Sequence, residues 1–251
     1  MNKYLGDFIY QTVLRFGFEI RRRQEVDKFK WLKEIGIDTI IDIGANEGQF
    51  ADFLRRLMPD AMMYSFEPLK DCYEALLKNR GGDPRFRAFN LAISDQCGEV
   101  PFYRSSFSQS SSILPSDQLH KENFPFAAEE TLITVHSVTL DSIASELSIG
   151  KHLLIKIDVQ GVEEKVFSGG GDTLQKADIV FLETNFQPLY ASQFFFKESL
   201  DRMYDMGFRY MGNITEQLLS PINGTCLEED SVFINDRFFD KHGRFIGRDA
   251  P

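Results

Sequence analysis

Acidic residues and glycines meet where the first apolar run of this sequence ends. The segment TIIDIGANEG, residues 39–48, places Asp42 at the end of a β-branched run, with Gly44 and Gly48 directly after it. Glycine lacks a Cβ atom, so the backbone can turn tightly there and a ligand can approach it closely. A helix beginning near Glu47 would direct its free N–H groups at the same point. The segment therefore predicts a ligand site at a strand-to-helix turn.

The charge of this turn favours a cationic ligand. A dinucleotide-binding turn has the pattern G-x-G-x-x-G, and this chain lacks the second and third of those glycines. Asp42, Glu47 and the later Glu67 suit the sulfonium and ammonium groups of S-adenosylmethionine better than the pyrophosphate of NAD. Two alternatives stay open: an NAD(P)-dependent oxidoreductase, and a non-catalytic cofactor-binding or scaffold protein.

Glu67 follows the next apolar run, AMMYSF at residues 61–66. A carboxylate at the end of a second strand can accept hydrogen bonds from both hydroxyls of a ribose through its two oxygens. Taken alone, Glu67 would be a solvated charge at a strand end. Together with the glycine turn, it predicts a ribose-binding residue.

Asp158 and Glu183 lie at the ends of two later apolar runs, at residues 152–159 and 178–184. Methyl transfer from a sulfonium is an in-line displacement, in which the enzyme aligns a nucleophilic oxygen and accepts its proton. Asp158 is the first candidate for this base, and His136 and Glu183 are weaker alternatives. Asp158 could instead anchor the cofactor or the N-terminus of the next helix, and His136 could be a structural residue of an alternating strand.

The elements that must position these residues alternate along the chain. Apolar runs of strand length are separated by helical patterns, which is the order of a largely parallel sheet covered on both faces. We therefore predict an α/β fold with a doubly wound, largely parallel seven-stranded sheet, and a segment inserted near residues 98–138. The strands of this sheet are expected at residues 39–43, 61–66, 85–94, 152–159, 178–184, 208–214 and 231–236.

The first 30 residues have a different pattern from the rest. Apolar residues recur near one helical face and are followed by Arg21, Arg22 and Arg23. This predicts an amphipathic helical extension at residues 1–30, which either packs on the remaining domain at 31–251 or touches an acidic membrane surface. No stretch of the sequence is long and apolar enough for a transmembrane helix.

Composition excludes several other classes. The net charge of −10 and the pI near 5.0 oppose a nucleic-acid surface, which needs a basic field. The three cysteines lack metal-type spacing and predict reduced thiols in a cytoplasmic protein. The acids do not form a coordination set, so no metal ligands are assigned and metal dependence stays open.

Several ordered motifs resemble the FkbM-type methyltransferases, from about residue 37 to 236. These motifs are DIGANEG at residues 42–48, FEP at 66–68, NLAISD at 90–95, TLD at 139–141 and KIDVQGVE at 156–163. The resemblance implies the class I S-adenosylmethionine-dependent fold, which is Rossmann-like, and O-methylation of a hydroxyl on a sugar, a glycan or a small natural product. The family usually has an acid where this chain has Gln160, while Asp158 is in place.

The same resemblance implies a set of cofactor contacts. The turn after the first strand would hold the methionine part, the FEP motif the ribose, and the segment from Ala92 to Asp95 would flank the adenine. The expected cofactor-binding residues are Asp42, Gly44, Ala45, Asn46, Gly48, Glu67, Pro68, Ala92, Ser94 and Asp95.

Overall fold

A computed structural model describes residues 30–247. The predicted amphipathic helix at residues 1–30 lies outside these residues except for Lys30, so it stays a prediction, as do the domain boundaries drawn from it.

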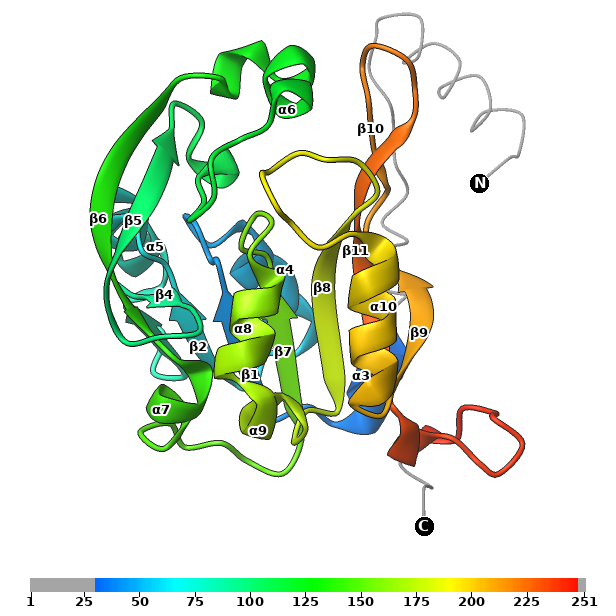
Figure 1. Cartoon of the computed structure of the whole chain (residues 1–251). Helices are drawn as coiled ribbons and strands as arrows, with labels where there is room; N and C mark the ends of the chain where they lie inside the picture. Colours follow the sequence, from blue (N-terminus) through cyan, green and yellow to red (C-terminus); the bar gives the residue numbers. More distant parts are fainter. Residues whose placement is uncertain (1–29, 248–251) are drawn as a thin grey trace, which may run out of the picture.

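The centre of the molecule is an eight-stranded, mostly parallel sheet (Figure 1). Its order is β10-β11-β8-β7-β1-β2-β3, and β9 also pairs with β11. The pairs from β8 to β3 are parallel, while β11 runs antiparallel to β8, β9 and β10. The predicted doubly wound α/β fold is thus confirmed, with the two-residue β10 as an eighth strand. The strands are β1 Thr39–Ile43, β2 Met62–Phe66, β3 Phe86–Phe89, β7 Leu153–Ile157, β8 Ile179–Asn185, β9 Phe208–Asn213, β10 Leu218–Leu219 and β11 Cys226–Asn235.

Helices cover both faces of this sheet, which makes a three-layer molecule (Figure 1). One face is covered by α3 Lys30–Ile35, α4 Gln49–Leu57 and α5 Lys70–Arg80. The other is covered by α7 Leu140–Ala144, α8 Glu163–Gly169, α9 Gly171–Leu174 and α10 Phe196–Asp205. A 3-10 turn, η3 Asp236–Phe238, follows the last strand.

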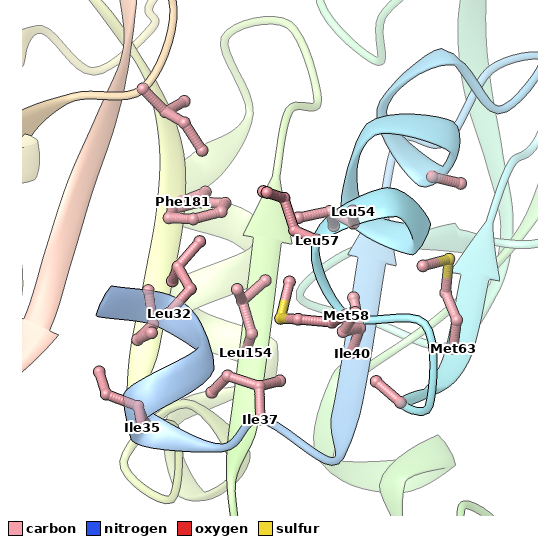
Figure 2. Packing of buried hydrophobic residues seen from close by; sticks show 14 of the residues in the cluster. Leu32, Ile35, Ile37, Ile40, Leu54, Leu57, Met58, Met63, Leu154 and Phe181 are labelled. Atoms are coloured by element: carbon pink, nitrogen blue, oxygen red, sulfur yellow. The ribbon is translucent and has the colours of Figure 1, made fainter. Parts of the chain in front are cut away.

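Side chains of each central strand alternate between these two layers. Leu154 of β7 packs with Leu32 of α3 and Leu57 of α4 (Figure 2), whereas Leu153 and Ile155 pack on the opposite face. Each buried side chain of this size contributes roughly 1.5–3 kcal/mol to folding. Burial on both faces explains why these strands read as continuous apolar runs.

The inserted segment forms a second, three-stranded sheet beside the first (Figure 1). β5 Gly98–Ser105 and β6 Glu130–Val138 pair antiparallel, and β4 Ala92–Ile93 joins β6. Between β5 and β6 lie η1 Ser108–Ser110, α6 Gln118–Asn123 and η2 Pro125–Ala127. The segment predicted near residues 98–138 is therefore confirmed as an addition to the main sheet.

The prediction of one continuous strand at residues 85–94 was wrong, because this segment forms two strands, β3 and β4, in different sheets. The Asn90 side chain donates hydrogen bonds to the carbonyl oxygens of Glu67, at 2.9 Å, and Pro68, at 2.8 Å. These bonds hold the chain in a bend, so it leaves the main sheet after β3 and enters the second sheet as β4.

The turn between β1 and α4 uses left-handed backbone conformations. Gly44 has φ +77°, Asn46 has φ +47° and Gly48, the N-cap of α4, has φ +98°. The helix begins at Gln49, two residues later than expected from Glu47. A Cβ atom on Gly44 would lie 1.8 Å from the carbonyl oxygen of Asp158. Gly44 therefore lets the turn pass directly against the end of β7.

We expect Gly44→Ala to lower the free energy of unfolding by more than about 2 kcal/mol, because left-handed strain and a backbone collision act together. Urea denaturation followed by circular dichroism measures this loss. Gly82→Ala is the matched control, since a Cβ there meets no atom within 4 Å. Equal stability of the two variants would contradict the predicted collision.

Candidate active site

A cavity of about 1020 Å³ opens at the carboxyl ends of the parallel strands. Its lining includes Gly44 after β1, Glu67 after β2, Asp158 after β7 and Glu183 near the end of β8. The serine-rich loop at residues 107–113 also lines it. This is the location at which open α/β sheets bind ligands.

The buried ammonium of Lys156, which lines the cavity, joins β1 to β7 through two carboxyls. Lys156 Nζ lies 3.0 Å from Asp158 Oδ2 and 3.6 Å from Asp42 Oδ1, and it donates to the Gly44 carbonyl at 3.0 Å. Burial lowers the pKa of Lys156, but the carboxylates of Asp158 and Asp42 outweigh burial and raise it above its usual value. Lys156 therefore stays charged and holds the turn against Asp158.

Glu67 is 4% exposed and joins two segments of the cavity wall. Its Oε2 accepts a hydrogen bond from the Asn46 N–H and its Oε1 accepts one from the Leu69 N–H, both at 2.8 Å. Burial raises the pKa of Glu67 to about 7 despite these two donors. Each oxygen keeps a further lone pair for a ligand hydroxyl.

A second network surrounds Gln160. Its Nε2 lies 2.9 Å from Asp158 Oδ1, and 2.9 Å and 2.8 Å from the two carboxyl oxygens of Glu183. Its Oε1 accepts a hydrogen bond of 2.6 Å from the hydroxyl of Tyr190. The two carboxyls predicted as alternative bases are thus linked through one amide.

Three acids near this network have raised pKa values because they are buried. Burial, followed by the charge of Asp158, raises the pKa of Glu183 well above its usual value and that of Glu228 to about 8. Burial also raises the pKa of Glu163 to about 7, against hydrogen bonds from backbone N–H groups. Glu183 and Glu228 line the cavity, whereas Glu163 is buried behind its wall. Perturbed carboxyls in one cavity are typical of functional sites.

An apolar slot adjoins Glu67 in the same cavity. It is lined by Leu69, Leu91, Ala92, Ile93 and Phe102. A planar, weakly polar ring fits such a slot, a diol fits the Glu67 carboxyl, and a cation fits the excess of acids in the wall. These three features of the lining suit the adenine, the ribose and the sulfonium of S-adenosylmethionine. The acids of the wall are Glu67, Asp158, Glu183, Glu216 and Glu228, against Lys156 and Arg56 as bases.

Most predicted site residues reach the cavity. Those that line it are Gly44, Ala45, Asn46, Glu67, Pro68, Ala92, Asp158 and Glu183.

Five predicted residues do not line the cavity. Asp42 is fully buried beneath it, and Gly48 faces Leu76 of α5 rather than the cavity. Ser94 is also buried; its Oγ donates to Asp95, which pairs with Lys165 at 3.0 Å. His136 is exposed on β6, opposite Glu99. Their strands or turns carry these side chains into the core or toward solvent.

Sequence reasoning missed Tyr190 and Glu228 and gave Gln160 no role. Tyr190 lies in a loop without a periodic pattern, and Glu228 reaches the wall because β11 folds back antiparallel beside β8. Only the departure at Gln160 from the acid usual in the motif could have drawn attention to this network.

Residues 42–210 match the methyltransferase FkbM domain, which is more than half of the chain. The chain belongs to this family. The methyltransferase is 32% identical over 168 residues to the 2-O-methyltransferase NoeI of Sinorhizobium fredii, covering 64% of this chain and 69% of that protein. It is 23% identical over 166 residues to the hexuronic acid methyltransferase AglP of Haloferax volcanii, covering 66% of this chain and 63% of that protein.

The methyltransferase sdnD of Sordaria araneosa is 26% identical over 153 residues, covering 52% of this chain and 59% of that protein. The chain therefore spans under two thirds of the length of sdnD and AglP. Among solved structures, magnesium protoporphyrin IX methyltransferase from Synechocystis PCC 6803, with bound SAM, has a TM-score of 0.44 and 10% identity, covering 84% of this chain and 78% of that chain. Precorrin-6y C5,15-methyltransferase from Geobacter metallireducens has a TM-score of 0.42 and 11% identity, covering 85% and 87%.

As a member of this family, the protein is an enzyme that uses S-adenosylmethionine as its methyl donor. This assignment replaces the oxidoreductase and scaffold alternatives. Within residues 30–247, no group of His, Cys, Asp and Glu is arranged to hold a metal ion. Over the same residues, no helix is long and apolar enough to cross a membrane. The cytoplasmic location and the absence of a nucleic-acid partner stay predictions.

We expect the methyltransferase to lose stability as pH rises from about 4.5 to 7, partly through Glu163. Its pKa is raised in the folded state, so the native protein binds the proton more tightly than the unfolded chain, and that stabilisation disappears as pH passes the folded pKa. The difference in free energy of unfolding between Glu163→Gln and the original protein should therefore increase in favour of the variant by roughly 2–3 kcal/mol from pH 5 to pH 8.

Denaturant titrations at several pH values measure this difference. Glu164→Gln, on the same helix but exposed, is the control and should leave the pH dependence unchanged. A Glu163→Gln curve parallel to that of the original protein would show that Glu163 does not carry the effect.

Proposed function

We propose that this methyltransferase transfers the methyl group of S-adenosylmethionine to a hydroxyl group of a sugar, free or within a glycan. The observation that carries the proposal is the pair of linked carboxyls, Asp158 and Glu183, in the wall of the cavity that also holds the glycine turn. Carboxyl oxygens can bind and deprotonate a hydroxyl. The 2-O-methyltransferase and hexuronic acid methyltransferase relatives support a sugar as the acceptor.

The proposed cofactor seat follows from the cavity lining. The turn at residues 44–46 would contact the methionine part, Glu67 would accept the ribose hydroxyls, and the apolar slot at Leu69, Ala92 and Phe102 would hold the adenine. Bound in this way, S-adenosylmethionine supplies an electrophilic methyl group on a positively charged sulfur.

Binding and deprotonation of the acceptor hydroxyl would depend on the acids of the cavity wall. Asp158 has Lys156 on one oxygen and Gln160 on the other, so its orientation is set by two donors. One lone pair per oxygen remains to hold the acceptor hydroxyl in line and to accept its proton. Glu183 is the second candidate base, because a carboxylate with a raised pKa is the stronger proton acceptor once ionised.

The acceptor side of the cavity includes elements beyond the matched domain. Ile214, Thr215, Leu218 and Glu228 line it, and the family match ends at residue 210. These side chains come from β10, β11 and the loop before them. We infer that this hairpin selects the acceptor of this protein.

Asp158→Asn should lower the rate of methyl transfer by about 10²–10⁴-fold, the range that a general base provides. It should lower the affinity for S-adenosylhomocysteine by less, because the asparagine oxygen can still accept a hydrogen bond from Lys156. The assay uses methyl-labelled S-adenosylmethionine with a panel of methyl glycosides, and mass spectrometry detects the product. His136→Gln is the control and should retain full activity, because His136 is exposed on β6. Normal turnover by Asp158→Asn would assign the base to Glu183 instead. If neither the original protein nor any variant methylates a glycoside of the panel, the proposed sugar acceptor is refuted.

Glu67→Ala should weaken binding of S-adenosylhomocysteine by about 10–100-fold, since it removes charge-assisted hydrogen bonds from a buried site. Isothermal titration calorimetry measures the affinity. Glu74→Ala, an exposed acid on α5, is the matched control. Because Glu67 also supports the turn, Glu67→Gln is measured in parallel as the smaller perturbation, and unchanged affinity in both variants would remove the ribose role.

A further inference from the structure

The side chain of Gln160 occupies the space between two acids of the cavity wall. One amide nitrogen contacts both carboxyls, Asp158 and Glu183, at 2.8–2.9 Å. An amide nitrogen has two hydrogens, so it can give one to each carboxyl.

The orientation of this amide is determined by its other end. The Tyr190 hydroxyl donates to Gln160 Oε1 at 2.6 Å and is itself close to the Ser110 carbonyl at 3.3 Å. A flipped amide would turn its oxygen toward two carboxyls, which repel it. The nitrogen therefore faces the acids.

The backbone of Gln160 is also held in place. Its φ is +58°, a left-handed conformation, and its carbonyl accepts a hydrogen bond of 2.6 Å from Ser112 Oγ. Next to it, a Cβ on Gly161 would lie 2.9 Å from the Cβ of Tyr190. The turn is thus packed against the Tyr190 loop and tied to the serine-rich loop.

Several charged or titratable groups surround the two acids. Among these groups the positive charge comes from Lys156, whose ammonium is paired with Asp158 at 3.0 Å. Acids on three further elements, α8, β11 and β1, add to the negative charge of Asp158 and Glu183, so there are more carboxyls here than one ammonium can neutralise. The groups facing Asp158 and Glu183 are Lys156 on β7, Glu163 on α8, Glu228 and Asp230 on β11, Asp42 on β1 and the hydroxyl of Tyr190.

We propose that Gln160 is a positioning residue that holds Asp158 and Glu183 as one hydrogen-bonded pair and sets the pH at which this pair takes up a proton. The amide favours the ionised carboxyls because it donates to them, yet it adds no positive charge to the wall. The link to turnover rests on the proposed function, whereas the link to titration does not.

Loss of the amide should raise the titration midpoint of Glu183. Burial and the charge of Asp158 already raise the pKa of Glu183, and a hydrogen bond to a charged group opposes that rise. Gln160→Leu and Gln160→Asn should each move the midpoint upward by about one to two pH units. Asn tolerates the left-handed backbone but is one methylene too short to bridge the acids. Tyr190→Phe, which frees the amide to rotate, should shift it in the same direction by less.

Carbon-13 NMR of protein labelled at the glutamate carboxyl carbon measures the titration directly, without any acceptor. The Glu183→Gln variant identifies the resonance. Gln118→Leu is the control, because Gln118 is a glutamine of α6 that is exposed and donates its amide hydrogen to Glu122, away from the Tyr190 loop. It should leave the Glu183 midpoint where it is in the original protein.

The same variants are then assayed across pH with methyl-labelled S-adenosylmethionine and a methyl glycoside. The acidic limb of kcat/KM should move upward with the NMR midpoint, since a base with a higher pKa becomes protonated at higher pH. An unchanged midpoint in folded Gln160→Leu and Gln160→Asn would overturn the positioning role. If no glycoside is methylated, the proposed function fails while the NMR titration still decides the role of Gln160.

Discussion

The buried ammonium of Lys156 is the interaction on which the rest of the site depends. It lies between Asp42 of β1 and Asp158 at the end of β7, and it also holds the Gly44 carbonyl. A buried charge without partners costs several kcal/mol, so these three groups must stay together. Because β1 and β7 are paired in register, with Asp42 beside Lys156, the glycine turn and the acid wall form one rigid unit.

Burial changes the acidity of two carboxyls in the wall of the cavity. It raises the pKa of Glu67 to about 7 and that of Glu228 to about 8. Such a wall offers both hydrogen-bond donors and acceptors near neutral pH. That combination suits the sugar acceptor proposed above. Under that proposal, the environment of each carboxyl decides whether it holds a hydroxyl or takes its proton.

The cavity is lined by residues from the matched domain and by residues from beyond it. The turn after β1 and the end of β2 belong to the matched domain, and they form the side proposed for the cofactor. The inserted segment, which also lies within the match, contributes its serine-rich loop, and the β10–β11 hairpin contributes Glu228 from beyond the match. Asn46 Nδ2 donates to Ser108 Oγ at 3.0 Å, so the insertion is connected directly to the cofactor turn. A common cofactor side can in this way be combined with an acceptor side that differs between proteins.

The sequence by itself determined the alternating sheet, the glycine turn and the acids at the ends of β1, β2, β7 and β8, because burial on both faces and tight turns leave local patterns. It also carried the motifs of the family. Only the tertiary structure decided that Asp42 lies under the cavity rather than in it, that His136 faces solvent, and that Gln160 bridges Asp158 and Glu183. Those outcomes depend on strand register and on contacts between distant loops, which no periodicity in the chain records.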